Sequence, residues 1–219
     1  MRPSFAGGHI KLNYFGTFQE YVAPGDSRYS FQRYTIDLSH EFPLYSTTRS
    51  FRPRDGNGPN DCSSGGTGNS CPSISRNREG SFSIQLIMNG SFVPSGHVVP
   101  FYFMPTLGGS DINGNPTLPS YQDYRFRAPN TLLARATFEH SIYGPLGITG
   151  IIDEGKVALH RGDLDFTHLR HSYSAGLTLR AGGFPMISLL FSFGGREGSH
   201  TSARINGSLL GGAARPSLY

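Results

Sequence analysis

Apolar and polar side chains alternate along this chain in nine separate stretches. In residues 33–44, for example, Tyr34, Ile36 and Leu38 are interleaved with charged and hydroxyl side chains. Successive side chains of a β-strand point to opposite faces, so each stretch predicts a strand with one apolar wall and one polar wall. The predicted strands span residues 8–22, 29–45, 79–94, 97–107, 130–143, 146–158, 172–181, 185–194 and 201–210.

The gaps between these strands alternate between short and long. Long gaps at 46–78, 108–129 and 159–171, with a shorter one at 195–200, follow every second strand. Short turns at one end of the strands and long loops at the other are typical of bacterial outer-membrane barrels, whose long loops face the cell exterior. We therefore expect an all-β fold, an antiparallel transmembrane β-barrel, with 46–78, 108–129 and 159–171 as extracellular loops.

The polar wall of the predicted strands carries charges of both signs. In a barrel this wall lines the lumen, where acidic and basic side chains can pair. A charge that faces lipid near mid-bilayer costs about 2–4 kcal/mol, and the pattern avoids such positions. The predicted lumen residues are Lys11, Arg33, Asp37, Glu41, Gln85, Arg135, Glu139, Asp153 and Arg180.

The number of predicted strands is odd, whereas bacterial single-chain barrels are even-stranded. An open sheet also leaves two unpaired edges, which lipid cannot satisfy. The residues after Met1 lack the apolar core of a secretory signal peptide. We therefore expect residues 1–219 to be one partial barrel, the C-terminal part of a larger one, with 211–219 as a tail. Such a piece is not expected to close as a monomer.

The amino-acid composition limits the classes of binding partner that we expect for this chain. Charged residues make up 16% of the chain, below the roughly 25% of an average soluble domain. The net charge of +4 comes almost wholly from scattered arginines, so we expect no nucleic-acid partner. No stretch approaches the roughly 18 apolar residues of a transmembrane helix.

Two cysteines, Cys62 and Cys71, lie in a segment rich in glycine and serine. They are candidates for a small disulfide, which fits an oxidising compartment. Two unpaired loop thiols are the alternative. No second pair of cysteines or histidines lies nearby with the spacing of a zinc site.

Histidines and aspartates crowd the predicted loop 159–171. Such residues form a metal site or a catalytic pair only if their side chains converge, and we expect an ordinary polar loop instead. The chain contains no Gly-x-Ser-x-Gly, His-Glu-x-x-His or phosphate-binding motif. The sequence therefore predicts no enzyme, no cofactor and no metal. The residues concerned are His160, Asp163, Asp165, His168 and His171.

An ordered series of segments carries a family resemblance: Val99–Asp111, Tyr124–Asn130, Tyr143–Gly147 and Ile151–Val157. This series resembles the bacterial surface antigen domain of the BamA/TamA outer-membrane assembly superfamily, over roughly residues 29–200. The resemblance implies a sixteen-stranded barrel, preceded in the periplasm by repeat domains that bind client polypeptide. It therefore implies N-terminal barrel strands and periplasmic repeat domains that are missing from this sequence.

The resemblance also implies a site. In the family, the loop that corresponds to 108–129 folds back into the lumen, and an Arg-Gly-aromatic tip meets an acidic residue of an Asp-x-Gly strand. Asp153 and Gly155 match that strand, and Gly155 would let the loop backbone come close. At the tip, Pro119 and Ser120 stand where Arg and Gly are expected, while Tyr121 matches the aromatic residue.

Because the tip arginine is missing, the resemblance does not identify the basic side chain that pairs with Asp153. Arg125 and Arg127 are candidate substitutes, because a guanidinium in a confined lumen needs a carboxylate. The inner-wall glutamate that family members often carry appears here as Thr137, with Glu139 two residues on. The implied site is therefore Tyr121, Arg125, Arg127, Glu139, Asp153 and Gly155.

The function that the resemblance implies is insertion or translocation of polypeptides at the bacterial outer membrane. Its partners would be outer-membrane lipid and client polypeptides, and pairing of a client strand with a barrel edge would replace covalent chemistry. A passive or structural barrel is the alternative, favoured by the missing tip arginine. A barrel enzyme that uses loop 159–171 and a soluble β-sandwich are more distant hypotheses.

Overall fold

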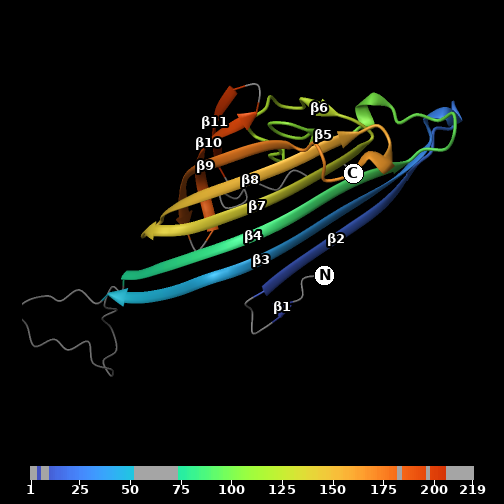
Figure 1. Cartoon of the computed structure of the whole chain (residues 1–219). Helices are drawn as coiled ribbons and strands as arrows, with labels where there is room; N and C mark the ends of the chain where they lie inside the picture. Colours follow the sequence, from blue (N-terminus) through green and yellow to red (C-terminus); the bar gives the residue numbers. More distant parts are fainter. Residues whose placement is uncertain (1–3, 6–9, 52–73, 182–183, 196–197, 206–219) are drawn as a thin grey trace, which may run out of the picture.

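The computed structural model describes residues 4–5, 10–51, 74–181, 184–195 and 198–205, and their side chains within 11–45, 79–179, 187–194 and 199–203. Cys62, Cys71 and the tail 211–219 lie outside the described residues, as does most of the predicted loop 46–78. Strands make up most of the described residues (Figure 1). Among them, no helix is long and apolar enough to cross a membrane.

The strands of the main sheet are β1 (Ser4–Phe5), β2 (Ile10–Tyr21), β3 (Phe31–Phe51), β4 (Ile74–Phe92), β7 (Asn130–Tyr143), β8 (Leu146–Ala158), β9 (Arg170–Ala181), β10 (Phe184–Gly195) and β11 (Gly198–Ile205). A two-stranded sheet contains β5 (Thr106–Leu107) and β6 (Phe126–Arg127). Three short 3-10 helices complete the described elements: η2 (Ser27–Tyr29), η3 (Phe101–Phe103) and η4 (Arg161–Asp163).

The main sheet is antiparallel and nine-stranded, in the order β1-β2-β3-β4-β7-β8-β9-β10-β11. The predicted all-β antiparallel fold is therefore confirmed. The sheet curls, with β5 and β6 on its inner side (Figure 1), but it does not close into a barrel. Within the described residues, β1 and β11 are its two edges.

The predicted strand 97–107 is wrong. The chain leaves the main sheet after Phe92, forms η3 and the two residues of β5, and returns only at Asn130. Three prolines, Pro94, Pro100 and Pro105, lie between Phe92 and β5, and proline has no N–H to donate to a strand ladder. The ninth strand of the sheet is β1 instead.

This change moves one of the predicted long loops to the other end of the sheet. One end of the sheet, here called the loop end, carries the connections β2–β3, β4–β7 and β8–β9. The other end carries the β3–β4 connection and the two-residue β7–β8 turn. The predicted loop 46–78 is thus on the opposite end from 108–129. Its outer parts, 46–51 and 74–78, belong to β3 and β4.

The two predicted walls are confirmed. Hydroxyl and carboxyl side chains of the inner wall are buried, including Asp153, Ser172, Ser174, Thr178 and Ser192. The outer wall is a continuous set of exposed apolar side chains across neighbouring strands: Tyr14, Phe18, Ile84, Phe138, Ile148, Ile152, Tyr173, Leu177, Leu179, Ile187, Leu189, Phe191 and Phe193. Cross-strand pairing keeps each set on one face, as in the row formed by Ile148, Leu177 and Leu189.

Candidate functional site

The long β4–β7 connection folds back over the inner wall. Two glycines in left-handed backbone conformations, Gly108 (φ 108°) and Gly109 (φ 56°), turn the chain after β5. The Gly108 amide donates to Thr117 Oγ1 (3.1 Å), and the Gly109 amide donates to the Leu118 carbonyl (3.1 Å). Loop 108–129 is therefore a compact unit with its own hydrogen bonds.

An apolar cluster seats this loop on the sheet. Leu107, Leu118 and Tyr121 pack against Leu133 of β7, and all four are buried. We call these four residues the seat. The side chains packed around this cluster are Ile87, Phe126 and Val157. Burying one such leucine contributes about 1.5–3 kcal/mol, so the cluster stabilises the position of the loop against the wall.

Gly155 makes room for the seat. A Cβ at this position would lie 3.1 Å from Cδ1 of both Leu107 and Leu118. The predicted close approach is therefore present, but it is made by these leucine side chains rather than by the loop backbone. A glycine on the inner wall of β8 lets both leucines reach the sheet.

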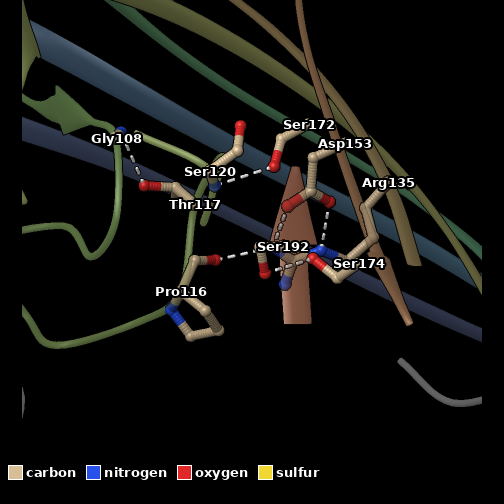
Figure 2. A network of polar contacts seen from close by, with 9 residues as sticks. All are labelled: Gly108, Pro116, Thr117, Ser120, Arg135, Asp153, Ser172, Ser174 and Ser192. Atoms are coloured by element: carbon tan, nitrogen blue, oxygen red, sulfur yellow. Dashed lines mark hydrogen bonds and ion pairs between the residues drawn. The ribbon is translucent and has the colours of Figure 1, made fainter. Parts of the chain in front are cut away.

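The buried carboxylate of Asp153 is paired with a wall arginine (Figure 2). Arg135 Nε donates to Asp153 Oδ1 (2.6 Å) and Arg135 Nη2 donates to Asp153 Oδ2 (2.7 Å). The same Nη2 also donates to the Pro116 carbonyl of the loop (2.7 Å). We call Arg135, Asp153 and the Pro116 carbonyl the clasp, because together they tie the loop to two wall strands.

Hydroxyl groups extend the polar contact along the wall. The Ser120 amide donates to Ser172 Oγ of β9 (3.0 Å), and Ser174 and Ser192 share a hydrogen bond of 2.7 Å (Figure 2). Ser120 is fully buried, and its Oγ has no hydrogen-bond partner within the part of the chain that the structure describes. The loop tip therefore contacts the wall through its backbone.

The predicted partners of Asp153 are corrected by this geometry. Arg127 donates to the Phe101 carbonyl (2.9 Å) and lies over the Phe101 ring. Arg125 is exposed, with its guanidinium over the Phe126 ring. Asp153 is paired with Arg135 instead because the two residues face each other directly across β7 and β8.

The other predicted site residues divide into two groups. Tyr121 belongs to the seat and packs edge-on against Phe126, with ring centroids 5.0 Å apart. Glu139 lies on the inner wall, four residues along β7 from Arg135, which is roughly 13 Å at the rise of a strand. Glu139 is therefore outside the clasp.

The polar residues of the β8–β9 connection do not converge. His160 pairs with Asp163 (3.5 Å), His171 pairs with Glu154 (3.1 Å), and Lys156 pairs with Asp165. Among the described residues, no group of three histidines, cysteines or carboxylates has the geometry of a metal site. Hydrogen bonds from Lys156 and then from Thr167 hold the pKa of the exposed Asp165 carboxyl well below its usual range.

A cavity of about 440 Å³ lies beside the seated loop, against β2, β3, β4 and β7. Its wall is a ladder of paired polar groups: Thr35 donates to Asn89 (2.7 Å), Asn89 donates to Thr131 (3.0 Å), and Gln85 donates to Asp37 (2.9 Å). The space between loop and wall is therefore preformed, with this polar ladder beside apolar side chains such as Phe15 and Ile87.

Comparisons with known proteins found no relative of this chain. No family model, no curated protein and no solved structure matches this chain.

Proposed function

We propose that this chain is part of an outer-membrane β-barrel protein of the BamA/TamA type, which inserts or translocates polypeptides at the bacterial outer membrane. The observation that carries the proposal is loop 108–129, which packs on the inner wall at Gly155 and is linked to Asp153 through the Arg135 guanidinium. These are the two positions at which the family resemblance expects the loop to meet the wall. The physical task of the site is to hold an infolded loop, and it needs no covalent chemistry.

The exposed apolar wall supports placement in a bilayer. An outward apolar face over a polar interior inverts the arrangement of a soluble sandwich, whose shared core is apolar. Toward the end of the sheet opposite the loop end, Tyr45 bonds to His140. Aromatic rings with a polar tip are favoured at the boundary between lipid and water.

The open edges support a role in strand pairing. An edge strand presents unpaired N–H and C=O groups, and in lipid each needs a partner from another strand. We propose that the missing N-terminal barrel strands supply part of this pairing, and that client strands join by β-augmentation. The seated loop covers the polar wall at β7, β8 and β9, between the two edges.

The test is to fix the loop on the wall. Ser120 and Ser172 are replaced by cysteine in a chain whose native Cys62 and Cys71 are serine, because the Ser120 amide lies 3.0 Å from Ser172 Oγ. The rate at which liposomes carrying the protein fold an unfolded outer-membrane client is then measured. We expect the crosslinked protein to lose the acceleration and to regain it on reduction, with Ser120→Cys alone as the control.

A passive or structural outer-membrane barrel is the second candidate function. The observation that favours it is the clasp, whose arginine lies on the wall rather than on the loop, so that the loop carries no charge into the pair. This candidate predicts steady single-channel conductance and no acceleration of client folding in either redox state. Client acceleration that disappears on crosslinking contradicts it.

A further inference from the structure

A second cavity, of about 540 Å³, lies at the loop end of the sheet, and its lining includes residues of both walls. Glu20, Gln32 and Phe92 lie next to one another across β2, β3 and β4 and line it. They alternate with the inward residues Tyr21 and Phe31, so their side chains belong to the outer wall. Residues 159–161 of the β8–β9 connection close its other side.

Apolar side chains around this cavity are uncovered. Val22 is 73% exposed and Leu159 is 72% exposed, and Phe92 and Val93 are each exposed by more than a third. Asn130 Nδ2 holds the backbone of this rim by donating to the Leu159 carbonyl (3.1 Å). The cavity is thus a fixed groove with apolar walls that need a hydrocarbon partner.

Two opposite charges line the groove without pairing with each other. The Arg161 guanidinium lies 3.9 Å over the Phe92 ring, and no hydrogen bond or carboxylate engages it among the described residues. Glu20 is exposed, and among the described residues it accepts only a long hydrogen bond from the Gln32 amide (3.4 Å). Stacking on a ring leaves the N–H edge of a guanidinium available to a phosphate.

The remaining titratable groups at the groove already have partners. His97 Nδ1 contacts the Ser30 carbonyl (3.0 Å), and His160 pairs with Asp163 of its own turn. The free recognition groups are therefore one guanidinium, one carboxylate and the apolar walls. A ligand that carries only an anion meets Arg161 but is repelled by Glu20.

From this arrangement we propose that the groove binds a phospholipid with a zwitterionic headgroup. Arg161 receives the phosphate, Glu20 receives the ammonium, and an acyl chain lies along Val22, Phe92 and Leu159. A guanidinium binds a phosphate through two parallel hydrogen bonds, and a carboxylate accepts from an ammonium. The inference rests on the membrane placement proposed above and adds a lipid class and a site to it.

The experiment measures lipid that stays on the full chain released from nanodiscs of equal phosphatidylethanolamine and phosphatidylglycerol, by native mass spectrometry. We expect retained phosphatidylethanolamine to exceed phosphatidylglycerol. Arg161→Gln and Glu20→Gln should each reduce that excess roughly threefold, the scale of an exposed ion pair. Arg28→Gln is the matched control, since Arg28 is an exposed loop-end arginine already paired with Asp26.

Equal retention of the two lipids overturns the inference, as does an excess that neither groove variant changes. Displacement of the lipid by millimolar inorganic phosphate also contradicts it, because the apolar walls then contribute nothing. Failure of the chain to enter nanodiscs at all contradicts the membrane placement as well. A chain that enters them without headgroup preference overturns the lipid site alone.

Discussion

Asp153 is among the most deeply buried of the described side chains. It is fully buried, and both of its oxygens accept from Arg135. The sequence indicated that a basic side chain pairs with this carboxylate, but it did not identify that side chain. Counting back from the two-residue turn at 144–145 would place Arg135 opposite Glu154. A register shift between Ser141 and Tyr143 moves the pairing by one residue and brings Arg135 to Asp153.

Replacing this carboxylate by an amide tests the clasp. We expect Asp153→Asn to lower the free energy of unfolding by about 3 kcal/mol, because a buried guanidinium then lacks its counter-charge. Urea unfolding in detergent micelles, followed by gel mobility, measures the change. The double variant Asp153→Asn/Arg135→Gln should recover part of the loss, and an unchanged midpoint in the single variant argues against the clasp.

Gly155 gives a second prediction at the residue scale. Gly155→Val should displace the loop, since even its Cβ would lie 3.1 Å from Leu107 and Leu118, and overpacking of this kind costs about 1–3 kcal/mol. Faster cleavage by trypsin after the exposed Arg125 reports loop release. Gly150→Val on the same strand is the control, because nothing lies within 4 Å of a Cβ there. Equal cleavage of the two variants would rule out the seat.

At the scale of elements, the alternating pattern predicted most strands to within a few residues. It was wrong at 97–107, where a run of apolar residues without alternation predicts a strand although two prolines, Pro100 and Pro105, interrupt the segment. That single error also reversed the side on which loop 46–78 lies. Alternation of apolar and polar residues indicates a strand whose two faces have different surroundings. A segment that packs on the inner wall as a loop has no such alternation, so the pattern does not locate it.

The β8–β9 connection carries a pH prediction. Lys156 and Thr167 lower the pKa of Asp165, so their contribution is present at pH values above the ordinary carboxyl range. It is lost only as the pH falls through the depressed pKa of the folded state. We expect hydrogen exchange of residues 160–169, corrected for intrinsic rates, to show equal protection at pH 6 and pH 4.

The matched variant is Asp165→Asn, which removes the acceptor charge at every pH. In this variant, the protection of residues 160–169 against hydrogen exchange should be roughly threefold lower at both pH values, the scale of an exposed ion pair. Loss of protection in the unchanged chain by pH 4 would contradict the role given to Lys156.

At the scale of the whole molecule, the sequence predicted the two walls and the antiparallel sheet, which follow from side-chain alternation. It also predicted that loop 108–129 meets Asp153 and Gly155, through the family resemblance. The seat of Leu107, Leu118, Tyr121 and Leu133 was not foreseen. Those residues are spread over 27 positions of sequence, and only the backbone turn at Gly108 and Gly109 brings them together.

The central claim is that the exposed apolar wall faces lipid, and neighbouring residues of β10 test it most directly. Leu189 points outward and is 51% exposed, whereas Ser188 lies on the inner wall. Single cysteines at these positions, in a chain without Cys62 and Cys71, are labelled with a fluorophore and reconstituted with brominated lipid. Strong quenching at 189 and little at 188 is the predicted result. Equal quenching, or none at 189, would contradict the account.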